Sequence, residues 1–380
     1  MTDAPLKILH VFRAPLGGLF RHVVDLVSGQ VERGHQVGII ADALTGGTRA
    51  EESLGKLAGK LSLGVTRYPM QRHIGLSDIA AMRHVRTRIT DADPDVIHGH
   101  GAKGAAYARL TAMGHRAIRA YTPHGGSLLY RPGTLGSRFY VSLEWIMRGR
   151  TDLFLFESAY GLALYKQKVG EPGGVVRVVH NGIGPADFEL ISPAPDATDI
   201  VFIGELRSVK GVDILLDAIG GLHAKGMRLG AAIVGDGPDR LSLQQHAKRL
   251  GLDQHVRFYG PMPARQAFAL GRLMVVPSRA ESLPYIVLEA VAAGIPLITT
   301  NVGGVPEIFG PMADRLIPAE NAAALAQAIE IAVNDLAAMR DAAQALRERV
   351  GAVFSVDGMV EGVLAGYRDT VKKPTNLMSQ

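Results

Sequence analysis

Two glutamates near the end of an apolar strand are the first candidates for chemistry. Glu281 lies in the short polar loop after strand 274–276, and Glu289 comes eight residues later, inside a helix predicted to begin near Pro284. A proline is tolerated in the first helical turn because its missing N–H would have no partner there. The strand's end and the free N–H groups of the helix together predict a cradle for an anion.

Basic residues and glycines stand at two other strand ends. Arg207 and Lys210 follow the strand predicted at 200–203, where a planar guanidinium and a mobile ammonium suit a diphosphate. Gly17 and Gly18 separate the first strand from the first helix and allow backbone N–H groups to approach a phosphate closely. The loop lacks a G-x-G-x-x-G pattern and the chain lacks G-x-x-x-x-G-K-[ST], which disfavours a dinucleotide site and a P-loop.

Histidines mark two strand ends in the first half of the chain. His124 lies in Tyr121–Gly126, on a turn bordered by glycines, where it could donate a hydrogen bond to a sugar hydroxyl. Alternatively, this histidine has only a structural role, in which its side chain caps the turn. His98 and His100 stand two residues apart with no nearby carboxylate, which makes a poor metal site.

Three alternating aspartates, Asp91, Asp93 and Asp95, superficially suggest a metal site that would hold a diphosphate through a divalent cation. They precede the strand predicted at 96–98 rather than follow it, so we expect them at the opposite edge of the sheet from the strand ends named above. The sequence therefore predicts no metal site.

Alternating apolar strands and helical segments predict that parallel sheets position these groups. In the first half, strands are expected at 7–12, 37–41, 96–98, 118–122, 153–156 and 175–179. Helices are expected between them at about 19–32, 77–90, 102–113, 135–148 and 159–168. In the second half, strands are expected at 200–203, 230–234, 256–259, 274–276, 296–299 and 315–317. Helices there are expected at about 211–224, 238–250, 263–270, from 284 onward, 305–308, 320–349 and 356–371.

The predicted fold class is α/β, with two doubly wound, Rossmann-like domains facing each other across a cleft. Residues 1–183 form the first domain, the proline-rich segment 184–197 is a linker, and residues 198–355 form the second domain. Ligands bind at the carboxyl ends of parallel strands, so the loops named above should line the cleft.

The composition is that of a globular chain long enough for two hydrophobic cores. Of its 380 residues, 47% are apolar and 20% are charged. Cysteine is absent, which excludes disulfides, thiolate metal ligands and cysteine nucleophiles. The N-terminus lacks the pattern of a signal peptide, and no apolar run approaches the ~20 residues that span a bilayer. These features predict a soluble, cytoplasmic protein.

The net charge of +5 is unevenly distributed along the chain. Residues 1–190 contain 23 Lys and Arg against 16 Asp and Glu. The densest basic segment, called the arginine cluster below, contains Arg67, Arg72, Arg83, Arg86 and Arg88. Such a cluster suits an anionic bilayer or a phosphorylated substrate, and an ordinary solvated helix face is the plain alternative. Nucleic acid is disfavoured, because the segment has no interleaved aromatic residues suited to stacking.

Several short motifs follow one another along the chain: the glycines at 17–18, Thr122-Pro-His124-Gly, Val179-His-Asn181-Gly182, Gly204-x-Leu-x-x-x-Lys210-Gly211, Gly235-Asp-Gly-Pro, Glu281-x7-Glu289, Ala292-Ala-Gly294-Ile-Pro and Gly303-Gly-Val-Pro-Glu307. In this order they resemble the family 4 retaining glycosyltransferases of the GT-B fold, and the resemblance covers essentially the whole sequence. The resemblance implies transfer of a sugar from a nucleoside-diphosphate sugar to a saccharide or lipid-linked acceptor, in cell-surface polysaccharide or glycolipid biosynthesis.

The resemblance also implies a role for each motif. Lys210 and a nearby arginine would neutralise the donor diphosphate, helped by the backbone of Gly17 and Gly18. Glu289 would hold the ribose hydroxyls, while Glu281 and His124 would contact the transferred sugar as catalytic residues. The implied donor contacts also include Leu283, Pro284, Tyr285 and Ile286, with a nucleobase wall at Tyr259, Gly260 and Met262.

Two positions depart from the family's pattern. The phosphate-binding arginine of the family usually occupies the position of Glu205, so we expect Arg207, which points the same way in an extended chain, to replace it. Pro284 stands where the family often has glycine, which removes one N–H donor to the sugar.

The mechanism implied by the resemblance is metal-independent transfer with retention at the anomeric carbon and without a cofactor. Arg207, Lys210 and the helix N-terminus would stabilise the charge that develops on the departing diphosphate. The first domain would bind the acceptor, and the helix within 356–380 would cross back to that domain. The arginine cluster would contact anionic headgroups at the inner face of the plasma membrane.

Other activities are weighed against this interpretation. In a glycoside hydrolase two carboxylates flank the scissile bond, whereas Glu281 and Glu289 belong to one side of the predicted site, so we reject a hydrolase. A nucleotide-sugar epimerase on the same fold and a non-catalytic nucleotide- or carbohydrate-binding module remain alternatives.

Overall fold

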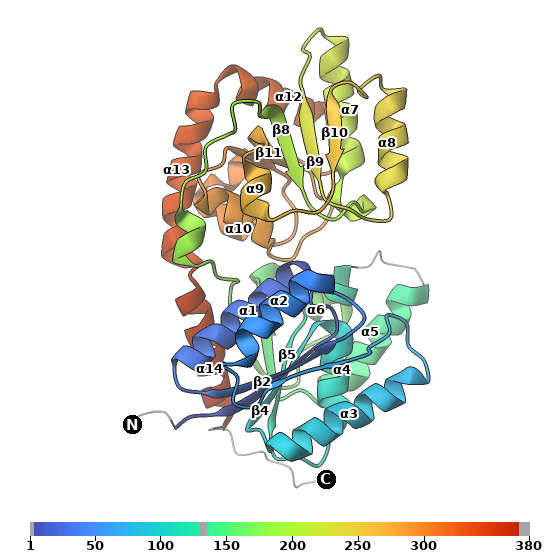
Figure 1. Ribbon diagram of the computed structural model, residues 1–380, viewed down its shortest axis with the longest axis vertical. Coiled ribbons are helices and arrows are strands. Elements are labelled where there is room, and N and C mark those ends of the chain that lie inside the picture. The colour runs from blue at the N-terminus through green and yellow to red at the C-terminus, as the bar shows by residue number, and fades with distance from the viewer. Residues whose placement is uncertain (1–3, 130–134, 372–380) are drawn as a thin grey trace. The chain divides into compact units, whose positions relative to one another are not determined.

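The computed structural model describes residues 4–129 and 135–371, which belong to two compact units. Unit 1 combines the chain up to Gly182 with the segment from Val356, and unit 2 runs from Ile183 to Ser355. Each unit contains one parallel sheet with helices on both of its faces (Figure 1). The predicted α/β fold class is confirmed.

Unit 1 is built on a seven-stranded sheet in the order β3-β2-β1-β4-β5-β6-β7. Its strands are β1 (Lys7–Phe12), β2 (Gln36–Asp42), β3 (Val65–Tyr68), β4 (Val96–His100), β5 (Ile118–Thr122), β6 (Leu153–Phe156) and β7 (Val175–Val178). Its helices are α1 (Gly17–Glu32), α2 (Gly47–Ala58), α3 (Ser77–Ala92), α4 (Gly101–Thr111), the 3₁₀ turn η1 (Gly126–Leu129), α5 (Leu135–Arg148), α6 (Ala159–Lys168) and α14 (Val356–Val371).

Helix α2 and strand β3 are not among the elements predicted from the sequence. Helix α2 buries Ala50, Leu54 and Leu57, whose spacing is that of one helix face, so its amphipathic pattern was available in the sequence. Strand β3 is a half-buried edge strand of only four residues, which leaves little alternation to read.

Unit 2 is built on a five-stranded sheet in the order β10-β9-β8-β11-β12. Its strands are β8 (Thr198–Ile203), β9 (Ala231–Val234), β10 (Val256–Tyr259), β11 (Gly271–Val276) and β12 (Leu297–Thr299). Its helices are η2 (Pro185–Phe188), η3 (Ser208–Lys210), α7 (Val212–Ala224), α8 (Arg240–Arg249), α9 (Ala264–Phe268), α10 (Tyr285–Ala292), α11 (Val305–Phe309), η4 (Gly310–Arg315), α12 (Ala322–Asn334) and α13 (Leu336–Val353).

The helix predicted at 320–349 is two helices. Asp335 ends α12 and caps α13, because its carboxylate accepts a hydrogen bond from Ala338 N. In the described parts of the chain no single helix is long and apolar enough to cross a membrane. The helices α12 and α13 meet that test only as a pair, which is bent by 102°. The strand predicted at 315–317 is a single β-bridge, between Ile317 and Thr300.

The segment 184–197, predicted as a linker, is packed against unit 2. Ile191 N donates to Ala293 O at 3.1 Å, and Ala194 N donates to Ala269 O at 2.8 Å. These bonds hold the segment between α10 and α9, so it is part of the second unit rather than a free connection.

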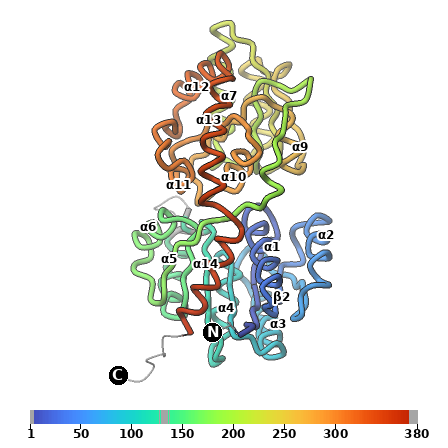
Figure 2. Tube along the Cα trace, turned by 90° about the vertical axis from the view of Figure 1, so that its left-hand side faces the viewer, coloured from blue at the N-terminus to red at the C-terminus, as the bar shows by residue number. Residues whose placement is uncertain are grey.

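Helix α14 completes the core of unit 1, where it lies beside α1 (Figure 2). A Cβ built on Gly29 of α1 would lie 2.6 Å from Val360 Cγ2, so glycine permits the close approach of the two helices. Tyr367 is fully buried, and its hydroxyl lies 2.8 Å from His98 Nδ1 of the central strand β4. The far end of the chain therefore stabilises the first sheet.

Replacing Tyr367 tests this docking. Tyr367→Ala should lower the free energy of unfolding by about 3–5 kcal/mol, because it leaves a cavity and removes the partner of a buried histidine. Val371→Ala, in the same helix at a position 61% exposed, should change it by less than about 0.5 kcal/mol. Urea denaturation measures both; equal effects would contradict the docking.

Candidate active site

The predicted anion site lies at the point where the strand order of unit 2 reverses. Successive strands β8, β9 and β10 run outward in one direction, while β11 and β12 lie on the other side of β8. Such a switch point is where doubly wound sheets bind ligands, beyond the carboxyl ends of the strands. Lys210 follows β8 and Glu281 follows the neighbouring strand β11, so both stand at this point.

Glycines allow the loops after these two strands to touch. Gly211 has a φ of +69°, and a Cβ there would lie 2.0 Å from the carbonyl oxygen of Pro277. Gly303 has a φ of +60°, and its Cβ would lie 1.8 Å from Glu281 O. Arg279 N also donates to Val209 O at 2.8 Å. The backbone thus fixes where Lys210 and Glu281 stand.

Lys210 and Glu281 form an ion pair across the two loops. Lys210 Nζ lies 2.6 Å from Glu281 Oε1, which also accepts a hydrogen bond from Ser278 Oγ at 2.7 Å. Glu281 is only 7% exposed, and Lys210 is half-buried. An ammonium has three N–H donors, so Lys210 can hold Glu281 and still donate to an anion. The structure therefore brings together these two predicted residues.

Arg279 fastens the same loops, a role that the sequence did not reveal. Its guanidinium pairs with Asp213 at 2.6 Å and with Glu320 at 3.1 Å. Burial alone would raise the pKa of Asp213, but the hydrogen bonds and charge of Arg279 outweigh it and lower that pKa below its ordinary value. The available signal was an arginine two residues before Glu281, together with an acidic residue in the first turn of α7.

Arg207 lies beyond the end of β8 and is partly exposed. Its Nη1 atom is 3.4 Å from Glu205 Oε2, while Leu206 between them is fully buried. The alternation of side chains continues past the end of the strand. Arg207 therefore lies on the same side of the chain as Glu205, as the sequence predicts.

The predicted donor contacts around α10 differ in burial. Leu283, Pro284 and Tyr285 are buried, while Ile286 and Glu289 are half-buried. Pro284 is the N-cap of a helix that starts at Tyr285, and no acidic residue stands in its first turn. The positive end of this helix therefore faces the loop that carries Glu281.

The predicted nucleobase wall lies at the edge of the sheet. Tyr259 ends the edge strand β10, and Gly260 and Met262 follow it. Arg240 donates to the carbonyl oxygens of Tyr259 and Gly235, each at 3.0 Å, and so ties this edge to the loop after β9. The role of the wall itself stays a prediction.

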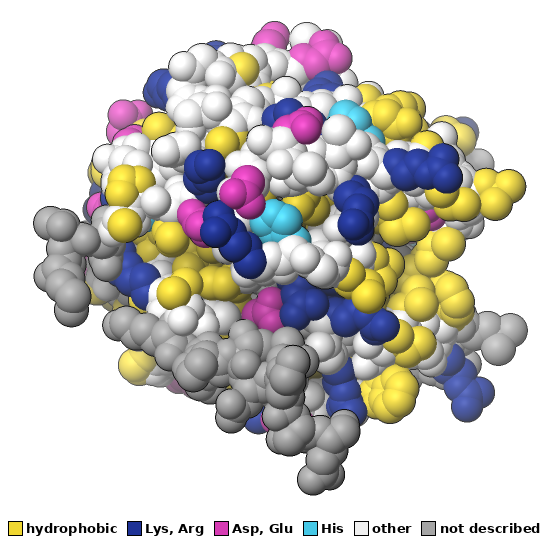
Figure 3. Space-filling model, turned by 90° about the horizontal axis from the view of Figure 1, so that it is seen from below, with side chains coloured by type: hydrophobic (Ala, Val, Ile, Leu, Met, Phe, Trp, Pro, Cys, Tyr) yellow, Lys and Arg dark blue, Asp and Glu magenta, His cyan; other side chains and the backbone are white. Residues whose placement is uncertain are grey.

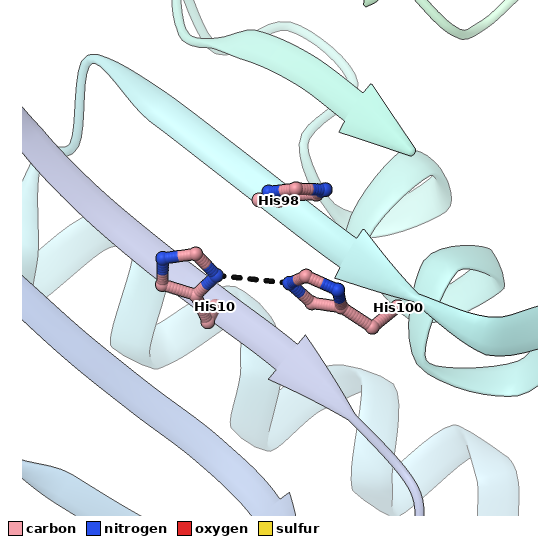
Figure 4. A group of neighbouring side chains, drawn as sticks. All are labelled: His10, His98 and His100. Carbon is pink, nitrogen blue, oxygen red and sulfur yellow. Dashed lines mark hydrogen bonds between the residues drawn. The ribbon is translucent and has the colours of Figure 1, made fainter. Parts of the chain in front are cut away.

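Unit 1 has its own switch point, between β1 and β4, and histidines gather there. His10 Nδ1 lies 2.9 Å from His100 Nε2, and His100 Nδ1 lies 3.1 Å from His124 Nε2 (Figure 4 shows the first of these contacts). His10 Nε2 donates to Gln30 Oε1 at 2.8 Å. Neutral rings then donate in sequence from His124 to His100 to His10 to Gln30. His124 Nδ1 is left as an acceptor, rather than the donor that the sequence suggested.

Burial keeps these rings neutral. It lowers the pKa of His10 to about 4, against the hydrogen bond to Gln30, and it lowers those of His100 and His124 well below the ordinary value. His124 has a φ of +53°, which is uncommon for a residue with a side chain and holds its ring toward His100.

His10 and His22 belong to this cluster and are absent from the sequence-based site. His22, on α1, lies with its ring centroid 4.7 Å from that of His124. A histidine within the apolar strand 7–12 was the available signal for His10. His22 gave no signal beyond its position one turn into the helix after the glycine loop.

Gly17 and Gly18 are exposed at the start of α1, beyond the end of β1. Gly17 has a φ of +59°, and a Cβ there would meet no atom within 4 Å. The first turn of α1 contains no acidic residue. This loop can accept a close approach of an anion, as the sequence predicts.

Two family models match most of the chain. The model described as Glycosyltransferase Family 4 matches residues 16–187, and the model described as Glycosyl transferases group 1 matches residues 197–335. The first match lies largely in unit 1 and the second lies in unit 2.

Curated proteins are similar over comparable lengths. Glycogen synthase of Mycobacterium tuberculosis is 26% identical over 89% of this chain and 88% of its own length. D-inositol 3-phosphate glycosyltransferase 1 of Catenulispora acidiphila is 29% identical over 74% of this chain and 73% of its own. One component of human phosphatidylinositol N-acetylglucosaminyltransferase is 26% identical over 78% of this chain and 62% of its own.

Solved structures share the fold at low sequence identity. HepE of Anabaena, in complex with UDP-glucose, has a TM-score of 0.80 at 19% identity, covering 96% of this chain and 100% of that one. Sucrose-phosphate synthase of Thermosynechococcus elongatus has a TM-score of 0.79 at 18% identity, covering 97% of this chain and 99% of that one.

Glycine substitutions test the contact between the two loops of unit 2. Gly211→Ala should lower the free energy of unfolding by several kcal/mol, because it adds a clash with Pro277 O to the strain of a positive φ. Gly226→Ala has the same kind of φ, +89°, but open space around its Cβ, so it should cost only about 1–2 kcal/mol. Urea denaturation decides, and equal losses would refute the close contact.

Proposed function

The chain belongs to the family 4 glycosyltransferases of the GT-B fold, and on that premise we propose that it is a retaining, metal-independent transferase of cell-surface polysaccharide or glycolipid biosynthesis. It is a hexosyltransferase that uses a nucleotide sugar. We assign it a saccharide or lipid-linked acceptor.

The observation that carries the proposal is the Lys210–Glu281 pair at the switch point of unit 2. A half-buried ammonium held at 2.6 Å by a buried carboxylate is positioned in advance for an anion. Arg207 and the N-terminus of α10 lie in or beside the same loops and add positive potential. These are the groups that a nucleoside diphosphate would need as it leaves.

In the proposed mechanism, positively charged side chains of the protein stabilise the negative charge of the leaving diphosphate. As the glycosidic bond breaks, negative charge gathers on the diphosphate, where Lys210 and Arg207 stabilise it without a metal ion. The acceptor hydroxyl attacks from the face of the leaving group, and its proton passes to the diphosphate. The new bond therefore keeps the configuration of the donor.

The remaining roles follow the family resemblance. Glu289 holds the ribose hydroxyls, and Glu281 contacts the transferred sugar with its second carboxylate oxygen. In unit 1, His124 contacts the sugar as a neutral ring, and the N–H groups at Gly17 and Gly18 approach phosphate. Burial supports the neutral state of His124.

We also propose that unit 1 binds the acceptor and contacts an anionic membrane at its cytoplasmic face. Arg72, Arg83 and Arg86 of the arginine cluster are exposed. Three apolar side chains beside them are exposed as well: Ile74, Leu76 and Ile79. Mixed basic and apolar surface, of the kind that Figure 3 shows on one face, suits a headgroup layer.

The other two arginines of the cluster stabilise the fold through hydrogen bonds to backbone carbonyl oxygens. Arg67 donates to the carbonyl oxygens of Asp42 and Thr45, and Arg88 donates to Leu63 O. The membrane contact is therefore assigned to the other three.

The function is tested with a panel of UDP-, GDP- and ADP-sugars and with saccharide and lipid-linked acceptors. Release of nucleoside diphosphate that depends on acceptor supports the transferase, and the anomeric coupling constant of the product, measured by NMR, reports retention. An isomerised sugar nucleotide without transfer would instead identify an epimerase. Binding without either reaction would identify a non-catalytic module.

Substitution of Lys210 and Arg207 tests the role of these two side chains in donor binding. Lys210→Ala should raise the Kd of the nucleoside diphosphate used in the panel by about 10–100-fold, because a charge-assisted hydrogen bond contributes about 1.5–3 kcal/mol. Arg207→Ala should raise it about 10-fold. Calorimetric titration gives both values, with Lys225→Ala and Arg340→Ala as surface controls in the same unit. An unchanged Kd in Arg207→Ala would remove that residue from the site.

Charge reversal tests the membrane contact. The variant R72E/R83E/R86E should sediment several-fold less with vesicles rich in phosphatidylglycerol, because each basic residue near an anionic surface contributes about 1 kcal/mol. The control K56E/K60E/R116E makes the same change in net charge elsewhere in unit 1. Equal sedimentation of the two variants would discard the proposed surface.

A further inference from the structure

The histidine cluster of unit 1 contains one ring nitrogen that its surroundings leave without a partner. Within the described residues, His22 Nε2 is buried and accepts no hydrogen bond. Its other nitrogen, Nδ1, lies 3.0 Å from Asn181 Oδ1, which can only accept, so the proton is on Nδ1 and Nε2 carries a lone pair. A buried acceptor without a partner costs about 1–3 kcal/mol and points to an absent ligand.

His100 and His124 each place a ring nitrogen close to the ring of His22. One nitrogen from each of His22, His100 and His124 lies within 4.8 Å of the other two. His100 Nδ1 and His124 Nε2, 3.1 Å apart, already have the separation that two ligands of one metal ion adopt. The three residues come from α1, from the end of β4 and from the loop after β5, at the edge of the sheet where ligands bind.

We propose that His22, His100 and His124 bind a divalent transition-metal ion of the zinc type. Imidazole nitrogens suit Zn²⁺ and its neighbours in the first transition row. Zn–N bonds of about 2.0–2.1 Å hold tetrahedral ligands about 3.3 Å apart, so the widest separation shortens by about 1.5 Å at most. Three protein ligands leave a fourth position open.

The residues behind the ligands are placed as a metal site requires. A ligating histidine normally donates its other N–H to a carbonyl or a similar acceptor, which fixes its tautomer. His22 donates to Asn181, and His100 donates from Nε2 to His10, which in turn donates to Gln30. Two of the three ligands are therefore oriented before any ion arrives.

The neighbouring triad of His10, His98 and His100 is a weaker candidate. Both nitrogens of His10 are engaged, with His100 and Gln30. Both nitrogens of His98 are engaged as well, with the hydroxyls of Tyr367 and Thr122 at 2.8 Å. An ion there would have to break a hydrogen bond of His98 as well as the His10–His100 bond, whereas at the proposed site it replaces only the His100–His124 bond.

The ligands are in the protonation state that metal binding needs. Burial lowers the pKa of His22 to about 4, against the hydrogen bond to Asn181, so its ring is neutral at pH 7. On binding, the proton of His124 moves from Nε2 to Nδ1, and Nε2 gives its lone pair to the ion. No net proton is released. His124 is the least buried of the three ligands.

Occupation of the site would inhibit the enzyme. The proposed function assigns His124 to the transferred sugar, and this consequence rests on that assignment. An ion that holds the ring of His124 would keep it from the sugar, so Zn²⁺ should act as an inhibitor.

Binding is tested on the full chain after treatment with a chelator, by titration with Co²⁺ followed through visible absorption and then by displacement with Zn²⁺. One ion per chain with the intense spectrum of tetrahedral Co²⁺ is expected. His22→Gln and His124→Gln should each raise the Kd about 100-fold or more, and Asn181→Ala should raise it about 10–100-fold. His115→Gln, a histidine that pairs with Asp93 outside the cluster, should leave the Kd unchanged.

Near-UV circular dichroism verifies that each variant is folded. Absence of Co²⁺ binding by the wild type, or a Kd unchanged in both His22→Gln and His124→Gln, would overturn the proposal. Where acceptor-dependent transfer is observed, Zn²⁺ should inhibit the wild type at concentrations about 100-fold lower than those that inhibit His22→Gln. Since the Co²⁺ titration needs no turnover, it decides the metal site even if the proposed function fails.

Discussion

The close approach of the loops after β8 and β11 is the constraint on which the proposed donor site of unit 2 depends. It requires glycine at 211 and 303, because any side chain there would meet a carbonyl oxygen. Once the loops touch, the half-buried Lys210 and the buried Glu281 are held together. Buried ion pairs contribute little to net stability compared with apolar packing. The position of this pair at the switch point is therefore better explained by ligand binding.

In unit 1 the side chains at the switch point are fixed by hydrogen bonds between neutral groups rather than by an ion pair. Its switch point carries a chain of hydrogen-bonded histidines, which burial keeps uncharged. This row of hydrogen-bonded histidines fixes the ring of His124 and leaves its Nδ1 atom available as a hydrogen-bond acceptor. Within unit 1, the switch point therefore presents a fixed hydrogen-bond acceptor rather than a charge.

The sequence predicts the features that are local and periodic. Strand ends, glycine loops and the glutamates at 281 and 289 follow from short patterns, and the α/β fold follows from their alternation. Features that depend on contacts across the sheet are not visible in the sequence. His10 meets His100 only because β1 and β4 are neighbours, although 90 residues separate them. Arg279 and Asp213 are likewise 66 residues apart.

The most direct test of the central claim is turnover in the presence of a chelator. If Lys210 and Arg207 stabilise the charge of the departing diphosphate, acceptor-dependent release of nucleoside diphosphate should be as fast with EDTA as without it. If the proposed histidine site holds an inhibitory ion, release should be faster with EDTA. Added Mg²⁺ or Mn²⁺ should not accelerate it. Loss of turnover in EDTA, restored by Mg²⁺ or Mn²⁺, would contradict the account.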